Sequence, residues 1–162
     1  MNEMHSTSPD LDREFISQAK TVQSLIEELI KCCEERRLYE NQKFGVPFAE
    51  LRCLLLFKEN DEYLTVKAIA HKLDVAKSRV TKLITGLLSK GLVRRFEAPH
   101  DTRVKLICLT AKGRRKVQEV NAFHQRIFQD LLGHIPVDER DKALAELSKI
   151  RDCMEKVKKK LV

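Results

Sequence analysis

The residues with the clearest chemistry are the Lys and Arg side chains between Leu64 and Arg115. This segment holds 13 of them against three acidic residues, whereas residues 1–63 carry an excess of acidic side chains. A cationic block in a chain of mixed charge is typical of a surface that binds phosphate, and the backbone of a nucleic acid is the obvious counter-ion. The charge pattern therefore predicts a nucleic-acid-binding module in the middle of the chain.

A helix within this block is expected to display the charge. From Val80 to Leu87 the apolar residues repeat at helical spacing, and at about 100° per residue they fall on one side. The opposite side has no acidic residue, which suits contact with phosphates and base edges. The alternative interpretation is an ordinary solvated helix face. The residues that we expect to bind DNA from this helix are Lys77, Ser78, Arg79, Thr81 and Lys82.

The residues before this helix predict a partner that orients it. The apolar spacing from Ile69 to Leu73 indicates a shorter helix, which Thr65 can cap. Ala70 is small where two helices must cross closely, and Asp74 falls where the turn needs a residue that can adopt left-handed backbone. Together the two segments predict a helix-turn-helix.

Two β-prone runs follow Gly91, which can end the second helix. The runs LVRRFEA and VKLICL bracket the sequence PHDT, whose residues form or tolerate turns. A two-stranded hairpin is marginal alone, so we expect it to pack on the helix-turn-helix as a wing. Its tip then presents His100 and Arg103. The apolar residues available for the packing are Leu92, Phe96, Leu106 and Leu109.

Three motifs around the hairpin are more restrictive than a generic helix-turn-helix. In chain order they are KGLVRR, Asp101-x-Arg103, and Leu109-Thr110 followed by Lys112-Gly113-Arg114. With these motifs the chain resembles the MarR family of bacterial transcription regulators. The resemblance implies a winged helix, a homodimer and binding to double-stranded DNA at a pseudo-palindromic operator.

The resemblance also assigns roles at the tip of the wing. It implies that Arg103 enters the minor groove and that Asp101 supports the wing by forming a pair that holds the Arg103 guanidinium. On spacing alone, Asp101 and Arg103 could equally form a local ion pair that stabilises the turn. His100 is expected beside them at the DNA.

The outer thirds of the chain are expected to supply helical arms. Apolar residues follow helical steps from Leu11 to Gln42, and Ser8-Pro9 can start that helix. Thr110 can cap a helix that runs through Leu132 and ends at Gly133, and Pro136 then opens another. That last helix carries a seam that its hairpin partner cannot fully cover. The residues of the seam are Leu144, Leu147, Ile150, Met154, Val157 and Leu161.

The arms predict a homodimer, since a second copy of the chain can cover the seam. The expected fold is mainly α with a small β-hairpin wing: a winged helix-turn-helix domain at 46–110, between dimerisation helices at 1–45 and 111–162. A two-fold dimer would place two reading helices at half-sites about 34–36 Å apart on one face of DNA. The alternative is an intramolecular bundle in a monomer.

A central helix is expected from Val46 to Asn60, linking the first arm to the DNA-binding module. The resemblance implies a small-molecule effector pocket where this helix meets the first helix and its dimer partner. No residue of the sequence identifies the effector. The residues expected to be buried in the central helix are Leu51, Leu54, Leu55 and Phe57.

The five cysteines are odd in number and lack CxxC spacing, so they predict no disulfide framework. We expect Cys53, Cys108 and Cys153 to be small apolar packing residues. Cys32 and Cys33 lie among basic residues that could activate a thiol, which makes them candidate redox or soft-metal sensors. Ordinary packing of Cys33 in the dimer is the alternative.

Other classes of function have little support in the sequence. The five histidines lack paired spacing, so neither a metal nor another cofactor is expected. The motifs G-x-S-x-G and H-E-x-x-H and the phosphate-binding P-loop do not occur, and we expect no enzyme activity. The polar N-terminus and the short apolar runs predict a cytoplasmic protein without a membrane span.

The residues and the resemblance together predict a sequence-specific, homodimeric transcriptional repressor. A small-molecule or oxidant effector is expected to release it from DNA by a population shift. The main alternative is an architectural DNA-coating protein with little sequence preference, which would use the same basic surface. A further alternative is an effector-binding or partner-binding module that has lost DNA binding.

Overall fold

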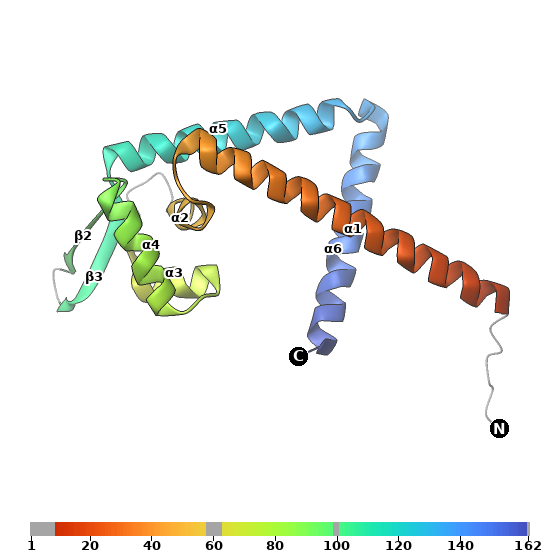
Figure 1. The fold of residues 1–162 in the computed structure, drawn as a ribbon, viewed down its shortest axis with the longest axis horizontal. Coiled ribbons are helices and arrows are strands. Elements are labelled where there is room, and N and C mark those ends of the chain that lie inside the picture. The colour runs from red at the N-terminus through yellow and green to blue at the C-terminus, as the bar shows by residue number, and fades with distance from the viewer. Residues whose placement is uncertain (1–8, 58–62, 99–100, 162) are drawn as a thin grey trace, which may run out of the picture. The chain divides into compact units, whose positions relative to one another are not determined.

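The computed structural model describes residues 9–57, 63–98 and 101–161. The chain divides into two compact units, Met1–Gly113 and Arg114–Val162. Figure 1 shows a mainly helical chain with a small antiparallel sheet, which confirms the predicted fold class. Within the described residues, no helix is long and apolar enough to cross a membrane.

The N-terminal arm is α1 (Pro9–Phe44), a helix of 36 residues. Proline suits the first position of a helix because its missing N–H would have no partner there. Ser8, the expected cap, lies outside the described residues. The helix ends before Gly45, whose φ of +63° is left-handed and whose N–H donates to the Asn41 carbonyl at 3.0 Å.

The central helix α2 (Phe48–Leu54) is shorter than predicted, with seven residues. The N–H groups of Leu56 and Phe57 donate to the carbonyls of Cys53 and Leu54, so the chain tightens into turns after the helix. Its end was hard to predict because the run from Cys53 to Phe57 is apolar throughout and has no periodicity. Residues 58–60 lie outside the described range. Of the predicted core positions, Leu55 is half-buried, and the buried ones are Leu51, Leu54 and Phe57.

The predicted helix-turn-helix is formed by α3 (Val66–Leu73) and α4 (Lys77–Ser89). The Thr65 hydroxyl caps α3 by accepting the Ala68 N–H at 3.1 Å, as predicted. Asp74 adopts the left-handed backbone of the turn, with φ 53° and ψ 54°. Val75 and Leu83 are half-buried. The buried apolar residues of the two helices are Ile69, Ala70, Leu73, Val80, Ile84 and Leu87.

Gly91 ends α4 with the backbone geometry that the sequence predicts. Its φ is +67°, its N–H donates to the Leu88 carbonyl, and the Leu92 N–H donates to the Leu87 carbonyl at 3.0 Å. This pair of hydrogen bonds is the Schellman motif, which a left-handed residue permits. The chain is thereby turned out of α4 and into the wing.

The wing belongs to a sheet of three antiparallel strands in the order β1-β3-β2: β1 (Leu64–Thr65), β2 (Val93–Ala98) and β3 (Asp101–Leu109). The sequence predicts the hairpin of β2 and β3 but not β1, which is too short to show alternation. Leu64 of β1 lies opposite Ile107 of β3. Ile107 is fully buried and lies on the same face of β3 as the buried Leu109, because side chains alternate along a strand.

The packing of the hairpin therefore differs in part from the prediction. Leu92 and Leu109 are buried as expected. Phe96 and Leu106 face each other across the strands and are only half-buried. The Phe96 ring makes an edge contact with the Tyr63 ring, with centroids 5.1 Å apart.

The start of α5 (Ala111–Gly133) is fastened to the turn that follows α4. Thr110 caps α5 by accepting the Gly113 N–H at 3.0 Å, and its hydroxyl donates to the Gly91 carbonyl at 2.7 Å. Lys112 Nζ donates to the Lys90 carbonyl at 2.8 Å. A Cβ on Gly113 would lie 3.0 Å from the Leu92 carbonyl carbon and closer still to its oxygen. Close approach of two backbones thus explains why glycine stands here.

We expect Gly113→Ala to lower the free energy of unfolding by about 1–3 kcal/mol, because the backbone it meets cannot move aside as a side chain can. Urea unfolding followed by circular dichroism measures the change. Gly133→Ala is the matched control, since a Cβ there meets nothing within 4 Å. Equal midpoints for both variants would contradict the explanation.

In the second unit, a short 3-10 helix (Val137–Glu139) follows Pro136, and α6 (Arg140–Leu161) completes the chain. Arg140 Nε donates to the carbonyls of Leu132 and Ile135, both at 3.0 Å, and so fastens the turn between α5 and α6. The apolar seam of α6 is 43–81% exposed within the single chain. No described residue of α6 is buried.

Two of the three cysteines expected to be small apolar packing residues are buried within the single chain. These two are Cys53 and Cys108, whereas Cys153 is exposed within the single chain. The reason is that Cys153 lies on α6, which has apolar residues but no partner in the described structure to cover them.

Candidate nucleic-acid interface

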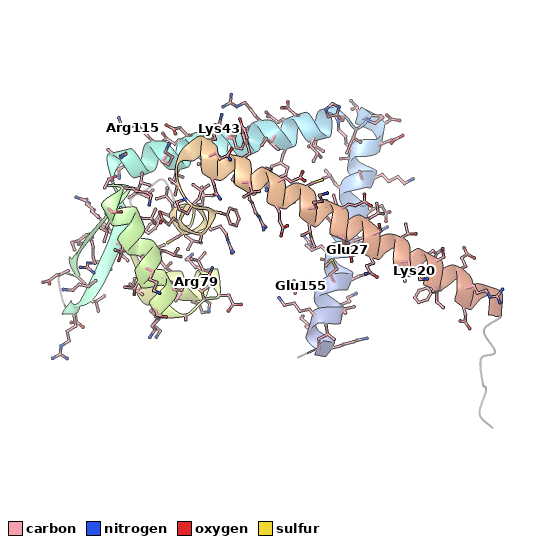
Figure 2. The ribbon with its side chains drawn as sticks, viewed as in Figure 1. Lys20, Glu27, Lys43, Arg79, Arg115 and Glu155 are labelled. Carbon is pink, nitrogen blue, oxygen red and sulfur yellow. The ribbon has the colours of Figure 1, made fainter. Side chains whose placement is uncertain are left out.

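The outer face of α4 carries the five residues predicted for DNA binding, and all five are exposed. Figure 2 draws the side chains of α4 as sticks and labels Arg79 among them. The Thr81 hydroxyl donates to the Lys77 carbonyl at 3.1 Å and keeps its lone pairs available as acceptors. The first turn of α4 has no acidic residue and no side-chain cap. Its backbone N–H groups and cations therefore offer donors to an anion.

The wing places Arg103 in a bulge near its tip. Ala98 pairs with Asp101, whereas the next pair is Glu97 with Lys105, so β3 holds extra residues between them. A bulge bends the strand and re-aims the side chain it carries. Arg103 is exposed at this position. His100, the other predicted tip residue, lies outside the described residues.

Asp101 supports the bulge through the main chain. Its Oδ1 accepts the backbone N–H of Arg103 at 2.9 Å, a local hydrogen bond typical of an Asx turn. The resemblance implies a pair between Asp101 and the Arg103 guanidinium. Among the described residues, the contact that Asp101 makes is instead with the Arg103 backbone. Asp101 thus fixes the backbone at Arg103 and leaves the guanidinium available.

The electrostatics of this unit favour an anionic partner. Glu97 forms an ion pair with Lys105 across the wing, so its charge is compensated. Further cations that the charge count could not single out are exposed as well: Lys67, Lys72 and Arg95. Arg94 instead serves the fold, since its Nε donates to the Cys108 sulfur at 3.1 Å and its guanidinium lies 6.0 Å from the Phe96 ring centroid.

The candidate thiols differ in accessibility. Cys32 and Cys33 are exposed on α1. Burial, with a contribution from Glu50, raises the pKa of Cys53 from 9.0 to about 11, which disfavours its reactive thiolate. In the described part of the chain, no group of three or more His, Cys, Asp and Glu side chains is arranged to hold a metal.

Comparison with known proteins gives consistent matches. Residues 44–104 match a model of the MarR family. The chain is 28% identical to the uncharacterized HTH-type transcriptional regulator YdgJ of Bacillus subtilis (strain 168) over 82% of this chain and 95% of the relative. It is also 28% identical to the HTH-type transcriptional repressor MdtR of the same strain, over 83% of this chain and 86% of the relative.

Solved structures are similar over most of the chain. The YusO protein from Bacillus subtilis has a TM-score of 0.72 at 27% identity and covers 90% of this chain and 99% of its own. Streptococcus pneumoniae FabT, solved in complex with DNA, has a TM-score of 0.72 at 19% identity, covering 84% of this chain and 99% of its own. At that identity the likeness to FabT concerns the fold.

Proposed function

Since this chain belongs to the MarR family of transcription regulators, we propose that it is a homodimeric, sequence-specific DNA-binding repressor. The observation that carries the proposal is the exposed face of α4, which holds cations and hydroxyls without an acidic residue. In a helix-turn-helix the second helix is the one that enters the major groove, and α4 is that helix here. Relatives named as regulators and a repressor support the same function.

In this proposal α4 reads the major groove and the wing reads the adjacent minor groove. Lys77, Ser78, Arg79, Thr81 and Lys82 contact phosphates and base edges, and His100 and Arg103 lie at the wing's end of the site. The narrow groove of A·T-rich DNA concentrates negative potential, which attracts an inserted guanidinium. Asp101 acts by holding the backbone of Arg103 in the bulge.

Arg103→Ala should weaken binding by about 1–3 kcal/mol and relax the preference for A·T pairs beneath the wing. The measurement is anisotropy titration of duplexes that differ only at those pairs. Arg13→Ala on α1 loses the same charge from an exposed site and is the control. If Arg103→Ala keeps the A·T preference of the native protein, Arg103 does not read the groove.

We assign dimerisation to the arms at 1–45 and 111–162 and DNA binding to 46–110. Both α1 and α6 carry rows of exposed apolar residues, which soluble proteins seldom leave uncovered over such lengths. A second copy of the chain covers them in the proposed dimer. Two copies of α4 then reach half-sites about one helical turn apart.

An effector releases the repressor in this proposal, either a small molecule or an oxidant. Effector binding that favours a different spacing of the two DNA-binding domains of the dimer lowers the affinity for the operator. Cys32 and Cys33 remain the predicted site for an oxidant. If peroxide leaves the DNA affinity of the native protein unchanged, oxidant sensing by these thiols is refuted.

The experiment that tests the function is selection of duplexes from a random pool by the full-length protein. A sequence-specific dimer should enrich a pseudo-palindrome with half-sites about one helical turn apart. An architectural protein would retain duplexes without enriching a motif. A pool that the protein does not retain at low salt would contradict DNA binding altogether.

A further inference from the structure

A half-buried ion pair connects the central helix to the recognition helix α4. Lys90 Nζ, just after the end of α4, lies 2.9 Å from Glu50 Oε2 on α2. The Lys90 side chain is 33% exposed and the Glu50 side chain 13%, and the two charges meet at ion-pair distance without the alignment of a hydrogen bond. Lys90 also donates to the Gly86 carbonyl at 3.3 Å. The lysine therefore compensates both the half-buried Glu50 carboxylate and the C-terminal end of α4.

Gly86 is what lets the carboxylate reach this position. A Cβ at Gly86 would lie 2.8 Å from the Glu50 Cδ, and closer still to Oε1. Gly86 lies in the interior of α4, where glycine is unfavourable for a helix. The absence of a side chain at this point allows Glu50 to pack directly on the helix backbone. We call Glu50, Gly86 and Lys90 the α2–α4 clamp.

The other side of α2 contacts the arm. The Arg37 guanidinium of α1 lies 4.6 Å from the centroid of the Phe48 ring of α2, a cation–π geometry. Within this unit, α2 therefore touches α1 through Phe48 and α4 through Glu50. The α2–α4 clamp is a polar contact at the interface between α2 and α4.

We propose that the α2–α4 clamp positions the recognition helix relative to the arm, so that Glu50, Gly86 and Lys90 are positioning residues for specific DNA binding. The inference rests on the proposed function of α4. The pair draws α2 and the end of α4 together, and removing the Glu50 carboxylate leaves the half-buried Lys90 ammonium without its partner. Loss of the clamp lets α4 sample orientations that fit the half-sites poorly.

The direction in which Glu50→Gln changes DNA affinity distinguishes a positioning role from a purely electrostatic one. Glu50→Gln removes a negative charge from a DNA-binding protein, so long-range attraction to phosphate alone would strengthen binding. The clamp predicts the opposite for the specific site. Because glutamine has nearly the same shape as glutamate, packing against Gly86 changes little.

Gly86→Ala disturbs the α2–α4 clamp at α4, whereas Glu50→Gln disturbs it at α2. The new methyl group meets the end of a flexible side chain, so the Glu50 carboxylate can swing away while α4 stays folded. In a Glu50→Ala background the same change meets no carboxylate. We therefore expect Gly86→Ala to weaken specific binding in the native protein and to have little further effect beside Glu50→Ala.

The test compares the full-length native protein, Glu50→Gln, Lys90→Met, Glu50→Gln with Lys90→Met, Gly86→Ala, and Gly86→Ala with Glu50→Ala. The probes are a labelled duplex enriched from the random pool by the native protein and a scrambled duplex of the same composition. Glu146→Gln with Lys149→Met, an exposed pair on α6, is the control. Thermal unfolding without DNA shows that each variant is folded.

The clamp predicts that Glu50→Gln and Gly86→Ala weaken binding to the enriched duplex by about 5- to 30-fold, while binding to the scrambled duplex changes less than about twofold. A purely structural role would lower the unfolding temperature and leave both affinities of the folded variants unchanged, which overturns the inference. If the native protein enriches a motif and Glu50→Gln binds it as tightly, the inference fails while the proposed function stands. If the native protein enriches none, both fail.

Discussion

Replacing Lys77 and Lys82 together with glutamate should abolish specific DNA binding, with a loss of roughly 10²–10³-fold or more in affinity. Both side chains lie on the exposed face of α4, in a helix that has no acidic residue. The double change removes two contacts to phosphate and places two negative charges against the DNA. The dependence of log affinity on log salt should also become shallower by about two units, one for each lost contact.

Anisotropy titrations at several salt concentrations measure both effects. Lys20→Glu with Lys31→Glu on α1 makes the same change in net charge at exposed positions outside α4. This control should lose far less affinity, because exposed charges beyond about 10 Å are largely screened at 0.1 M salt. Equal losses in the two double variants would mean that net charge alone, and not the α4 surface, accounts for binding.

Leu147→Glu with Ile150→Glu should convert the protein to a monomer. The two side chains are 58% and 43% exposed in the single chain and lie on the apolar seam of α6. If a second copy buries them, each glutamate introduces an unpaired charge into an apolar interface, which costs several kcal/mol. Loss of the dimer should lower DNA affinity by about 10²–10⁴-fold, because binding of one DNA-binding domain no longer holds a second one close to the other half-site.

Sedimentation equilibrium reports the oligomeric state, and the same titrations report the affinity. Ser148→Glu with Arg151→Glu, at exposed positions outside the seam of α6, is the control: it makes α6 more negative than the seam variant does and should still leave the dimer intact. A seam variant that still sediments as a dimer would show that α6 does not form the interface.

The sequence was most informative where a single residue type satisfies a local backbone requirement. Thr65 caps α3, Asp74 adopts left-handed backbone, and Gly91 ends α4, all as predicted. These residues bracket the helix-turn-helix, so its boundaries could be predicted without knowledge of the rest of the fold. Apolar spacing then assigned the buried side of α4.

The features that could not be predicted depend on contacts between distant segments. β1 is two residues long and exists because Leu64 and Thr65 pair with β3. Periodicity within one segment carries no information on such a partner.

The candidate site shows the same division. The spacing of α4 placed its exposed residues correctly on one face. The contact from Asp101 to the Arg103 backbone, and the approach of Glu50 to Gly86 and Lys90, needed three-dimensional positions. A glycine inside a helix was the signal that could have indicated a close contact at Gly86.

The most direct test of this account is competition between the enriched duplex and random DNA for the native protein. Labelled enriched duplex is bound first, and each unlabelled competitor is then titrated at one fixed salt concentration. We predict a preference of roughly 10³-fold or more for the enriched duplex. Equal competition by random DNA would contradict sequence-specific recognition by this winged helix.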